Sequence, residues 1–289
     1  NGHDVINLSY RNYVSKNFLT NKYDYLNNKI DTIINNYRPS LVVLGHNNVL
    51  SRNLIEKIKI KHNTKISLWY EDALGHRGKG PNWNDNLKLI ESNNDLIDSY
   101  FTTTHPDEIK TSIKKSKLNF LPIPVDENIE NLDLYNIKDK FKDLFFALSH
   151  GVNYGKLKKG KSDEREKFID QLMNRYPNLN YNILGIANEN PKWNYDFFRE
   201  LSKCKIALNL SRGFPIKYTS SNRIASLIGN GIYTFIDKKT KFNDFFDEDE
   251  VGFYSSIDQL GNKIENLISK PKLLNSYAKN GAKKYFKLL

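Results

Sequence analysis

The sequence predicts an α/β protein of two domains, each a parallel sheet flanked by helices. Short β-rich apolar runs alternate along the chain with longer segments whose apolar residues recur at helical spacing. The chain has 289 residues, of which 39% are hydrophobic, enough for two ordinary cores. A Pro-rich and then polar stretch near the middle separates two halves with this same pattern.

Nine runs are predicted to be strands, and nearly all are followed by turn residues and a helical segment. Four of them, in the first half, span residues 41–44, 66–70, 100–103 and 119–121. The other five span residues 144–148, 181–184, 206–210, 232–236 and 252–254. Because strands joined by helices run parallel, we expect two parallel sheets with helices on both faces.

The helices show apolar stripes that can cover a sheet. One stripe comprises Tyr23, Leu26, Ile30, Ile33 and Ile34, and another comprises Ile257, Leu260, Ile264, Leu267 and Ile268. A last helix, residues 273–287, follows Pro271 with no strand after it, so we expect it to cross back to the N-terminal domain. With a linker from Pro122 to Lys140, the predicted domains are residues 1–125 and 138–289.

Composition narrows the class of protein. The single cysteine, Cys204, excludes an internal disulfide and a thiolate zinc cluster. No apolar run approaches the roughly 20 residues of a membrane helix, so we expect a cytoplasmic protein. Lys+Arg exceed Asp+Glu by 44 − 33 = 11, a charge that favours anionic partners, although heavy use of Lys, Asn and Ile also follows from an AT-rich coding sequence.

Ligands of open parallel sheets bind beyond the carboxyl ends of the strands, and the segment after residues 206–210 is the richest there. A helix start behind Ser220 or Ser221 as N-cap, with cations nearby, would seat a phosphate. The alternative is an ordinary capped helix with solvated cations. The predicted binding residues of this segment are Arg212, Lys217, Tyr218, Ser220, Ser221, Asn222 and Arg223.

Two further strand ends extend the predicted site. After residues 144–148, His150 and Gly151 precede a basic run and Arg165, and these could face the same phosphate from the other side. The basic run by itself is typical of a solvated loop. After residues 181–184, Gly185 opens a segment suited to a flat nucleobase.

The first half carries different chemistry at its strand ends. Glu71 and Asp72 precede a glycine-rich loop, and a carboxylate beside a cleft could serve as general base toward a sugar hydroxyl. His46 and His105 occupy comparable positions after other strands. For each residue the alternative is a solvated or structurally bonded side chain. Asp72, His105 and Glu71 are the predicted catalytic residues.

The chain lacks a P-loop, an HExxH sequence, a C-x-x-C sequence and a nucleophile elbow, which argues against an NTPase, a zinc protease and an α/β-hydrolase. It also lacks an Asp-x-Asp at a strand end.

The second half resembles the C-terminal domain of GT-B glycosyltransferases, most closely the spore-maturation-type group. The resemblance is carried by "WNYDFFRELSKCKIALNLSRG" (residues 193–213), the loop 217–223, Gly229-Asn230-Gly231 and the run 232–236. In the first half, "SLWYEDA" is similar to a strand end of such enzymes, and the opening Asn1-Gly2-His3-Asp4-Val5 to their second strand, so the first strand is expected to be missing. Ser226 departs from the pattern, because the group commonly has a ribose-binding Glu there, and this leaves the donor's identity open.

The resemblance implies two Rossmann-like domains and transfer of a sugar from a nucleotide-diphosphate donor to a polysaccharide, glycolipid or glycoprotein acceptor. It also implies that this transfer needs no metal ion and no other cofactor. The implied partners are a nucleotide-sugar and a glycan or glycolipid acceptor, with peripheral contact to the anionic inner face of a membrane and no nucleic acid. Two alternatives stay open: a nucleotide-sugar epimerase of the same fold, and a non-catalytic polyanion-binding module.

Overall fold

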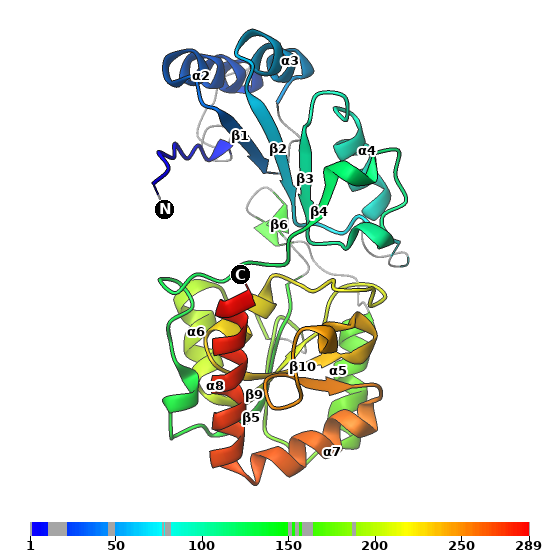
Figure 1. The fold of residues 1–289 in the computed structure, drawn as a ribbon. Coiled ribbons are helices and arrows are strands. Elements are labelled where there is room, and N and C mark those ends of the chain that lie inside the picture. The colour runs from blue at the N-terminus through cyan, green and yellow to red at the C-terminus, as the bar shows by residue number, and fades with distance from the viewer. Residues whose placement is uncertain are drawn as a thin grey trace. The chain divides into compact units, whose positions relative to one another are not determined.

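The structure is a computed structural model that describes residues 2–10, 22–45, 50–76, 78, 82–149, 152–153, 156–157, 164–186 and 189–288. The chain divides into two compact units, each built on its own sheet (Figure 1). The first unit comprises Asn1–Asp72, Asn84–Thr102 and Lys110–Phe120, and the second Ala73–Trp83, Thr103–Ile109 and Leu121–Leu289. Two short segments from the first half of the sequence therefore belong to the second unit.

The first unit contains a four-stranded parallel sheet in the order β1-β2-β3-β4. Its strands are β1 (Leu41–Gly45), β2 (Lys65–Tyr70), β3 (Ser99–Thr102) and β4 (Leu118–Phe120), and its helices are α2 (Lys22–Tyr37), α3 (Arg52–Lys61) and α4 (Trp83–Glu91). Ile66 and Tyr100 are fully buried in the central strands, and Leu26 and Ile55 are fully buried on helices α2 and α3. The four predicted strands of the first half are thus confirmed.

The second unit contains a five-stranded parallel sheet in the order β11-β10-β9-β5-β8. Its strands are β5 (Lys142–Ala147), β8 (Tyr181–Leu184), β9 (Cys204–Asn209), β10 (Tyr233–Asp237) and β11 (Gly252–Tyr254). The chain moves outward from β5 to β8 and then returns to the other side of β5 for β9. Neighbours β5 and β9 therefore mark the point where the strand order reverses, which is where open α/β sheets bind ligands.

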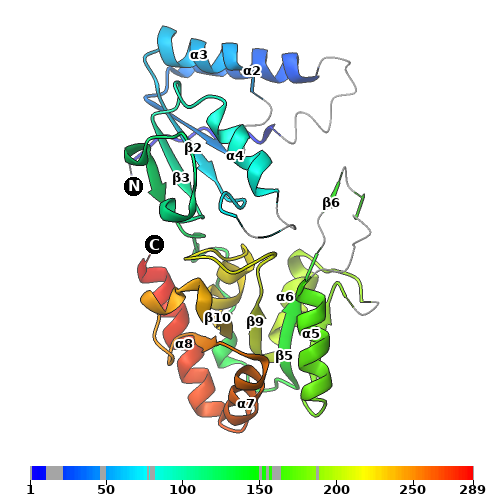
Figure 2. The ribbon, with the colours of Figure 1, turned by 90° about the vertical axis from the view of Figure 1, so that its right-hand side faces the viewer.

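Helices cover this second sheet, as Figure 2 shows for α5 and α6. They are α5 (Glu164–Arg175), α6 (Asn194–Ser202), α7 (Ile257–Ile268) and α8 (Pro271–Leu288). One buried cluster joins Leu144 and Ile206 to Ile169 of α5 and Ile264 of α7. In a second buried cluster, the Phe145 ring packs edge to face against Phe197 of α6, with ring centroids 5.3 Å apart. A short antiparallel pair, β6 (Val152–Asn153) and β7 (Lys156–Leu157), lies in the basic stretch after β5.

The stretch from Pro122 to Lys140, predicted as a linker, packs on the second unit. The Tyr285 hydroxyl of α8 donates a hydrogen bond to the Ile123 carbonyl (2.6 Å), and the Leu134 amide donates to the Asn230 carbonyl (2.9 Å). All of α8 belongs to this unit, and its crossing to the N-terminal domain stays a prediction. Residues 2–9 form no strand, contrary to the expectation for the opening segment.

The helix predicted after Ser220 or Ser221 is also different. Helical structure begins at Arg223 and becomes a five-residue π-helical turn, Ala225–Gly229. The Ile232 amide reaches back five residues to the Leu227 carbonyl (3.3 Å), and the Asn230 side chain bonds to the Ser226 carbonyl. The apolar face expected at Ile224, Leu227 and Ile228 is buried. Neither serine caps this short helix, because both hydroxyls bond elsewhere.

Candidate functional site

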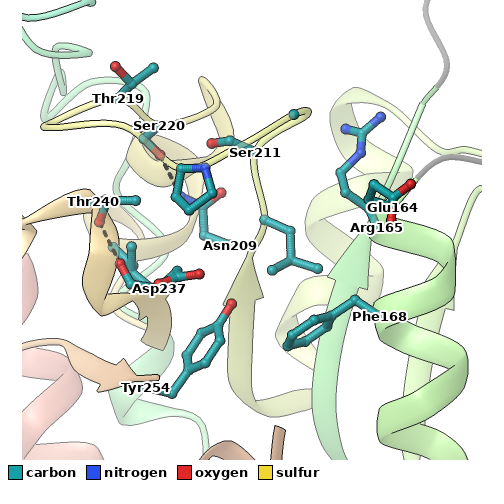
Figure 3. A pocket seen from close by; sticks show the side chains of 14 residues that line it. Glu164, Arg165, Phe168, Asn209, Ser211, Thr219, Ser220, Asp237, Thr240 and Tyr254 are labelled. Atoms are coloured by element: carbon teal, nitrogen blue, oxygen red, sulfur yellow. Dashed lines mark hydrogen bonds between the residues drawn. The ribbon is translucent and has the colours of Figure 1, made fainter. Parts of the chain in front are cut away.

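A cavity of about 130 Å³ lies at the carboxyl ends of β9, β10 and β11 in the second unit (Figure 3). Helix α5 supplies one wall with its first two turns. The loop after β9 supplies another. The lining residues are Glu164, Arg165, Phe168, Asn209, Leu210, Ser211, Gly213, Pro215, Thr219, Ser220, Ile236, Asp237, Thr240 and Tyr254.

Asn209, the last residue of β9, fixes the loop that forms the cavity wall. It is 4% exposed, and its amide nitrogen donates to the Ser220 hydroxyl (2.5 Å). Its carbonyl oxygen accepts from the Ser221 hydroxyl (2.7 Å). The Arg223 guanidinium donates to the Leu210 carbonyl (2.7 Å). The two serines and Arg223 thus bind the loop to the strand end, and Ser220 also lines the cavity.

The far side of the same loop is held by the turn after β10. The Tyr218 amide donates to the Thr240 carbonyl (2.7 Å), and Tyr218 has a left-handed backbone with φ of 54°. Its hydroxyl donates to Asp244 (2.7 Å), a bond that raises the pKa of Tyr218 because it favours the protonated phenol. Thr240 in turn donates to the Asp237 carbonyl. Two lining residues, Thr219 and Thr240, are positioned by these bonds.

Helix α5 brings a buried cation to the cavity. Arg165 lies in the first turn of this 12-residue helix and is 8% exposed. A helix N-terminus carries a partial positive charge and amide N–H groups without helical partners, so it favours anions. A guanidinium beside it can bond phosphate oxygens in bidentate fashion. The geometry supports an anionic group at this wall.

The inner end of the cavity is mostly apolar. The rings of Phe168 and Tyr254 lie there (Figure 3), with their centroids 5.8 Å apart, and Leu210 and Ile236 add to the apolar lining of the cavity. Tyr254 is 2% exposed, and burial raises the pKa of its hydroxyl well above the ordinary value. The phenol therefore remains a hydrogen-bond donor at neutral pH. Asp237 is the acidic group on this side.

A second, larger cavity of about 460 Å³ lies in the same unit and shares Pro215 with the first. Its lining is Glu108, Pro215, Ile216, Lys217, Lys239, Lys241 and Asp244. Lys217 makes an ion pair with Asp107 (3.7 Å) and lies over the Tyr218 ring. This cavity mixes cations with carboxylates.

The structure distributes the predicted binding residues over several roles. Arg165 and Ser220 line the first cavity, and Lys217 lines the second. Arg212 and Asn222 are exposed and line neither. Gly185 has φ of 83°, and a Cβ there would lie 1.8 Å from the Leu148 carbonyl oxygen, so glycine is required for strand-end packing. His150 and Gly151 lie outside the described residues.

The predicted catalytic residues fall in different units. Glu71 and Asp72 follow β2 in the first unit, where Asp72 is exposed and Glu71 is half-buried. His105 belongs to the second unit, where its Nδ1 accepts from the Asp107 amide (3.3 Å) and its ring meets Tyr218 edge to face. Burial and the nearby Lys217 lower the pKa of His105, so its imidazole is neutral at pH 7. His46 lies outside the described residues.

The lining residues that sequence reasoning missed include Asn209, Asp237, Tyr254 and Phe168. A signal was present for the first two, because each is the polar residue that ends an apolar strand at the ligand-binding edge. Tyr254 ends a strand too, but an aromatic side chain there is equally typical of the core. Phe168 lies on an amphipathic helix, where nothing separates it from other core positions.

Residues 164–287 match a family model described as "Glycosyl transferase-like". The matched segment contains the first cavity and α5 through most of α8. Residues outside it, including all of the first unit's sheet, are not matched. A search of the curated proteins finds no match to the chain by sequence.

Solved structures match the fold over nearly the whole chain. A sucrose-phosphate synthase from Thermosynechococcus elongatus has 10% identity and a TM-score of 0.59, covering 94% of this chain and 75% of its own. Anabaena HepE in complex with UDP has 11% identity and a TM-score of 0.59, covering 91% and 78%. The lipopolysaccharide outer core galactosyltransferase WaaB has 13% identity and a TM-score of 0.51, covering 93% and 81%.

These matches establish the GT-B fold, with its two parallel sheets flanked by helices. The family match indicates a glycosyl transferase-like segment at residues 164–287, and the solved structures show the fold alone. Neither the family match nor the solved structures test the predicted spore-maturation-type group, which stays a prediction. Among the described residues no helix combines the length and the apolarity needed to cross a membrane.

Proposed function

Since the second unit is glycosyl transferase-like, we propose that this chain transfers a sugar from a nucleotide-diphosphate donor to a glycan, glycolipid or glycoprotein acceptor. The donor binds in the second unit, and the first unit holds the acceptor. The observation that carries this proposal is the cavity beside the β5/β9 reversal, which has a buried arginine at one wall. HepE, which shares the fold, is described as binding UDP.

The proposed donor site neutralises the departing diphosphate with fixed charge. Arg165 bonds the phosphate directly, and Arg212 and Lys217 on the loop after β9 raise the local positive potential. Stabilising the leaving group in this way replaces the role that a divalent ion plays elsewhere, so we propose transfer without a metal. The excess positive charge would also favour an anionic membrane surface at the inner face of the membrane.

The base that deprotonates the acceptor hydroxyl is proposed among Asp72, Glu71 and His105. A neutral imidazole is the form that can take a proton, and the lowered pKa of His105 provides it at pH 7. A carboxylate on an exposed residue such as Asp72 is the other type of side chain that can act as general base.

The donor assignment is tested by a thermal-shift screen with UDP, GDP and CMP, followed by calorimetry of the stabilising nucleotide against two variants. Arg165→Gln is expected to weaken binding about ten-fold or more, because it removes a charge-assisted bond worth roughly 1.5–3 kcal/mol. Arg175→Gln is the matched control, since Arg175 lies in the last turn of the same helix and pairs with Asp258 on the surface.

Stabilisation by one nucleotide together with an effect confined to Arg165→Gln supports the proposal. Equal binding of all three nucleotides, lost in moderate salt, would instead favour a polyanion-binding module. Product analysis without acceptor separates transfer from epimerisation, because only an epimerase converts the donor sugar when it is alone.

A further inference from the structure

We infer that Tyr254 and Asp237 bind a vicinal diol of the donor at the inner end of the cavity. This rests on the proposed function and extends it, because it assigns a binding role to two side chains that neither the sequence motifs nor the family match singles out. The two residues end neighbouring strands, β11 and β10.

The Tyr254 hydroxyl is buried and makes no hydrogen bond within the described part of the chain. The side chain is 2% exposed, and its oxygen has no hydrogen-bond partner among the described residues. Figure 3 shows this hydroxyl pointing into the cavity, with Asp237 on one side and Phe168 on the other. Leaving a buried hydroxyl unbonded costs roughly 1–3 kcal/mol. A ligand oxygen in the cavity would remove that cost.

Strand pairing places Asp237 next to Tyr254. The two residues are register partners in the parallel pair of β10 and β11, so their side chains leave the same face of the sheet. Adjacent strands are about 4.8 Å apart. In the described part of the chain, Oδ1 of the Asp237 carboxylate accepts a hydrogen bond from the Lys239 amide (2.8 Å), which leaves Oδ2 for a ligand.

A diol suits this pair because each hydroxyl can both donate and accept. One hydroxyl oxygen accepts the proton of Tyr254, and its neighbour donates to the Asp237 carboxylate. A phosphate is disfavoured at this end, because it would lie against a carboxylate.

The position of the pair in the cavity selects a sugar over the nucleobase. Arg165, the proposed phosphate partner, lies across the same small cavity from Asp237 (Figure 3). In a nucleotide-sugar, the ribose and the transferred sugar both adjoin the diphosphate, whereas the base is separated from it by the ribose. The ring that shares so small a cavity with the phosphate is therefore a sugar, either the ribose or the transferred one.

The test combines Tyr254→Phe and Asp237→Asn with calorimetry and urea unfolding. Tyr254→Phe removes only the hydroxyl, so the free energy of unfolding should stay the same or rise while the dissociation constant increases about five- to ten-fold. Tyr285→Phe is the matched control, because its hydroxyl has a carbonyl partner within the protein. It should lower stability and leave the affinity unchanged.

The probes are UDP, UDP-glucose, GDP, GDP-glucose and the 2′- and 3′-deoxy forms of UDP and GDP. If the ribose supplies the diol, Tyr254→Phe weakens binding of the nucleoside diphosphate itself, and it does not further weaken binding of a deoxy form. If the transferred sugar supplies it, only the glucose conjugates lose affinity.

Binding that Tyr254→Phe and Asp237→Asn leave unchanged overturns the inference while the donor site survives. A loss of stability in Tyr254→Phe similar to that in Tyr285→Phe also overturns it, since the hydroxyl would then have a structural partner. If no probe binds the wild type, the proposed function fails together with the inference.

Discussion

Replacing Asn209 with alanine tests how the candidate site is built. Asn209 makes two side-chain hydrogen bonds, of 2.5 and 2.7 Å, which join β9 to Ser220 and Ser221 of the cavity loop. A buried hydrogen bond contributes about 1 kcal/mol, and both serine hydroxyls are half-buried and can bond water once released. We therefore expect Asn209→Ala to lower the free energy of unfolding by about 2 kcal/mol.

The assay is urea-induced unfolding followed by far-UV circular dichroism, for Asn209→Ala, Ser221→Ala and the double variant. Because Asn209 and Ser221 share a hydrogen bond, the two single losses in unfolding free energy should add up to about 1 kcal/mol more than the loss in the double variant. Asn243→Ala, on the surface near the site, is the control and should change stability by less than about 0.5 kcal/mol. An Asn209→Ala effect as small as this control, or full additivity with Ser221→Ala, would refute the reasoning.

Three other predictions concern packing and pH. Gly185→Ala should lower Tm strongly, because a left-handed backbone costs roughly 1–2 kcal/mol and the new Cβ would meet a carbonyl oxygen. Gly45→Ala is the control and should leave Tm nearly unchanged, because φ at Gly45 is not positive and nothing lies within 4 Å of the new Cβ. Equal Tm values for the two variants would contradict this. Burial raises the pKa of Glu200, but hydrogen bonds from nearby lysine and asparagine side chains outweigh this effect and leave the pKa below its ordinary value. The ionised Glu200 carboxylate therefore stabilises the folded state above its unfolded-state pKa, and this stabilisation is lost as the pH falls through its folded-state pKa. The stability gap between wild type and Glu200→Gln, measured by urea unfolding, should therefore narrow as the pH is lowered toward 3, and a constant gap would argue against it. Burial and Lys217 lower the pKa of His105, so its contribution is complete above about pH 6.5 and declines as pH falls; His105→Gln should flatten the rise in unfolding free energy between pH 5 and 7, and an unaltered slope would exclude this role.

The sheets and their covering helices were predictable because their signal is local. Runs such as 144–148 are buried on both faces, and Leu260 and Ile264 repeat at helical spacing, so burial and period can be inferred without knowing the partner. The link from strand to helix to strand then requires parallel pairing. Each strand was correct to within two residues of its observed ends.

The segment after β9 was harder because long-range contacts determine it. The helical signal at Ile224, Leu227 and Ile228 was real, but it gives no sign of a π-helical turn held by Asn230 bonding to the 132–134 segment. The same holds for the serines, whose role as caps was a reasonable local prediction. Their actual partner, Asn209, lies 11 and 12 residues earlier.

Predictions for the site succeeded where strand-end position sufficed and failed where side-chain direction mattered. Arg165 and Ser220 line the cavity as expected from their places after β5 and β9. Arg212 belongs to the same loop, yet it is exposed and lines neither cavity. Tyr254 shows the converse, since only the three-dimensional structure reveals that its hydroxyl faces the cavity and has no hydrogen-bond partner in the described part of the chain.

The central claim is that the second unit binds a nucleotide diphosphate in the cavity between α5 and the strand ends. A crystal structure of the wild-type protein with the nucleotide selected by the thermal-shift screen, grown in the presence of a chelator, tests it most directly. The account predicts diphosphate density within hydrogen-bond distance of the Arg165 guanidinium, with a sugar ring toward Asp237 and Tyr254. An empty cavity, or a nucleotide bound elsewhere on the chain, would contradict it.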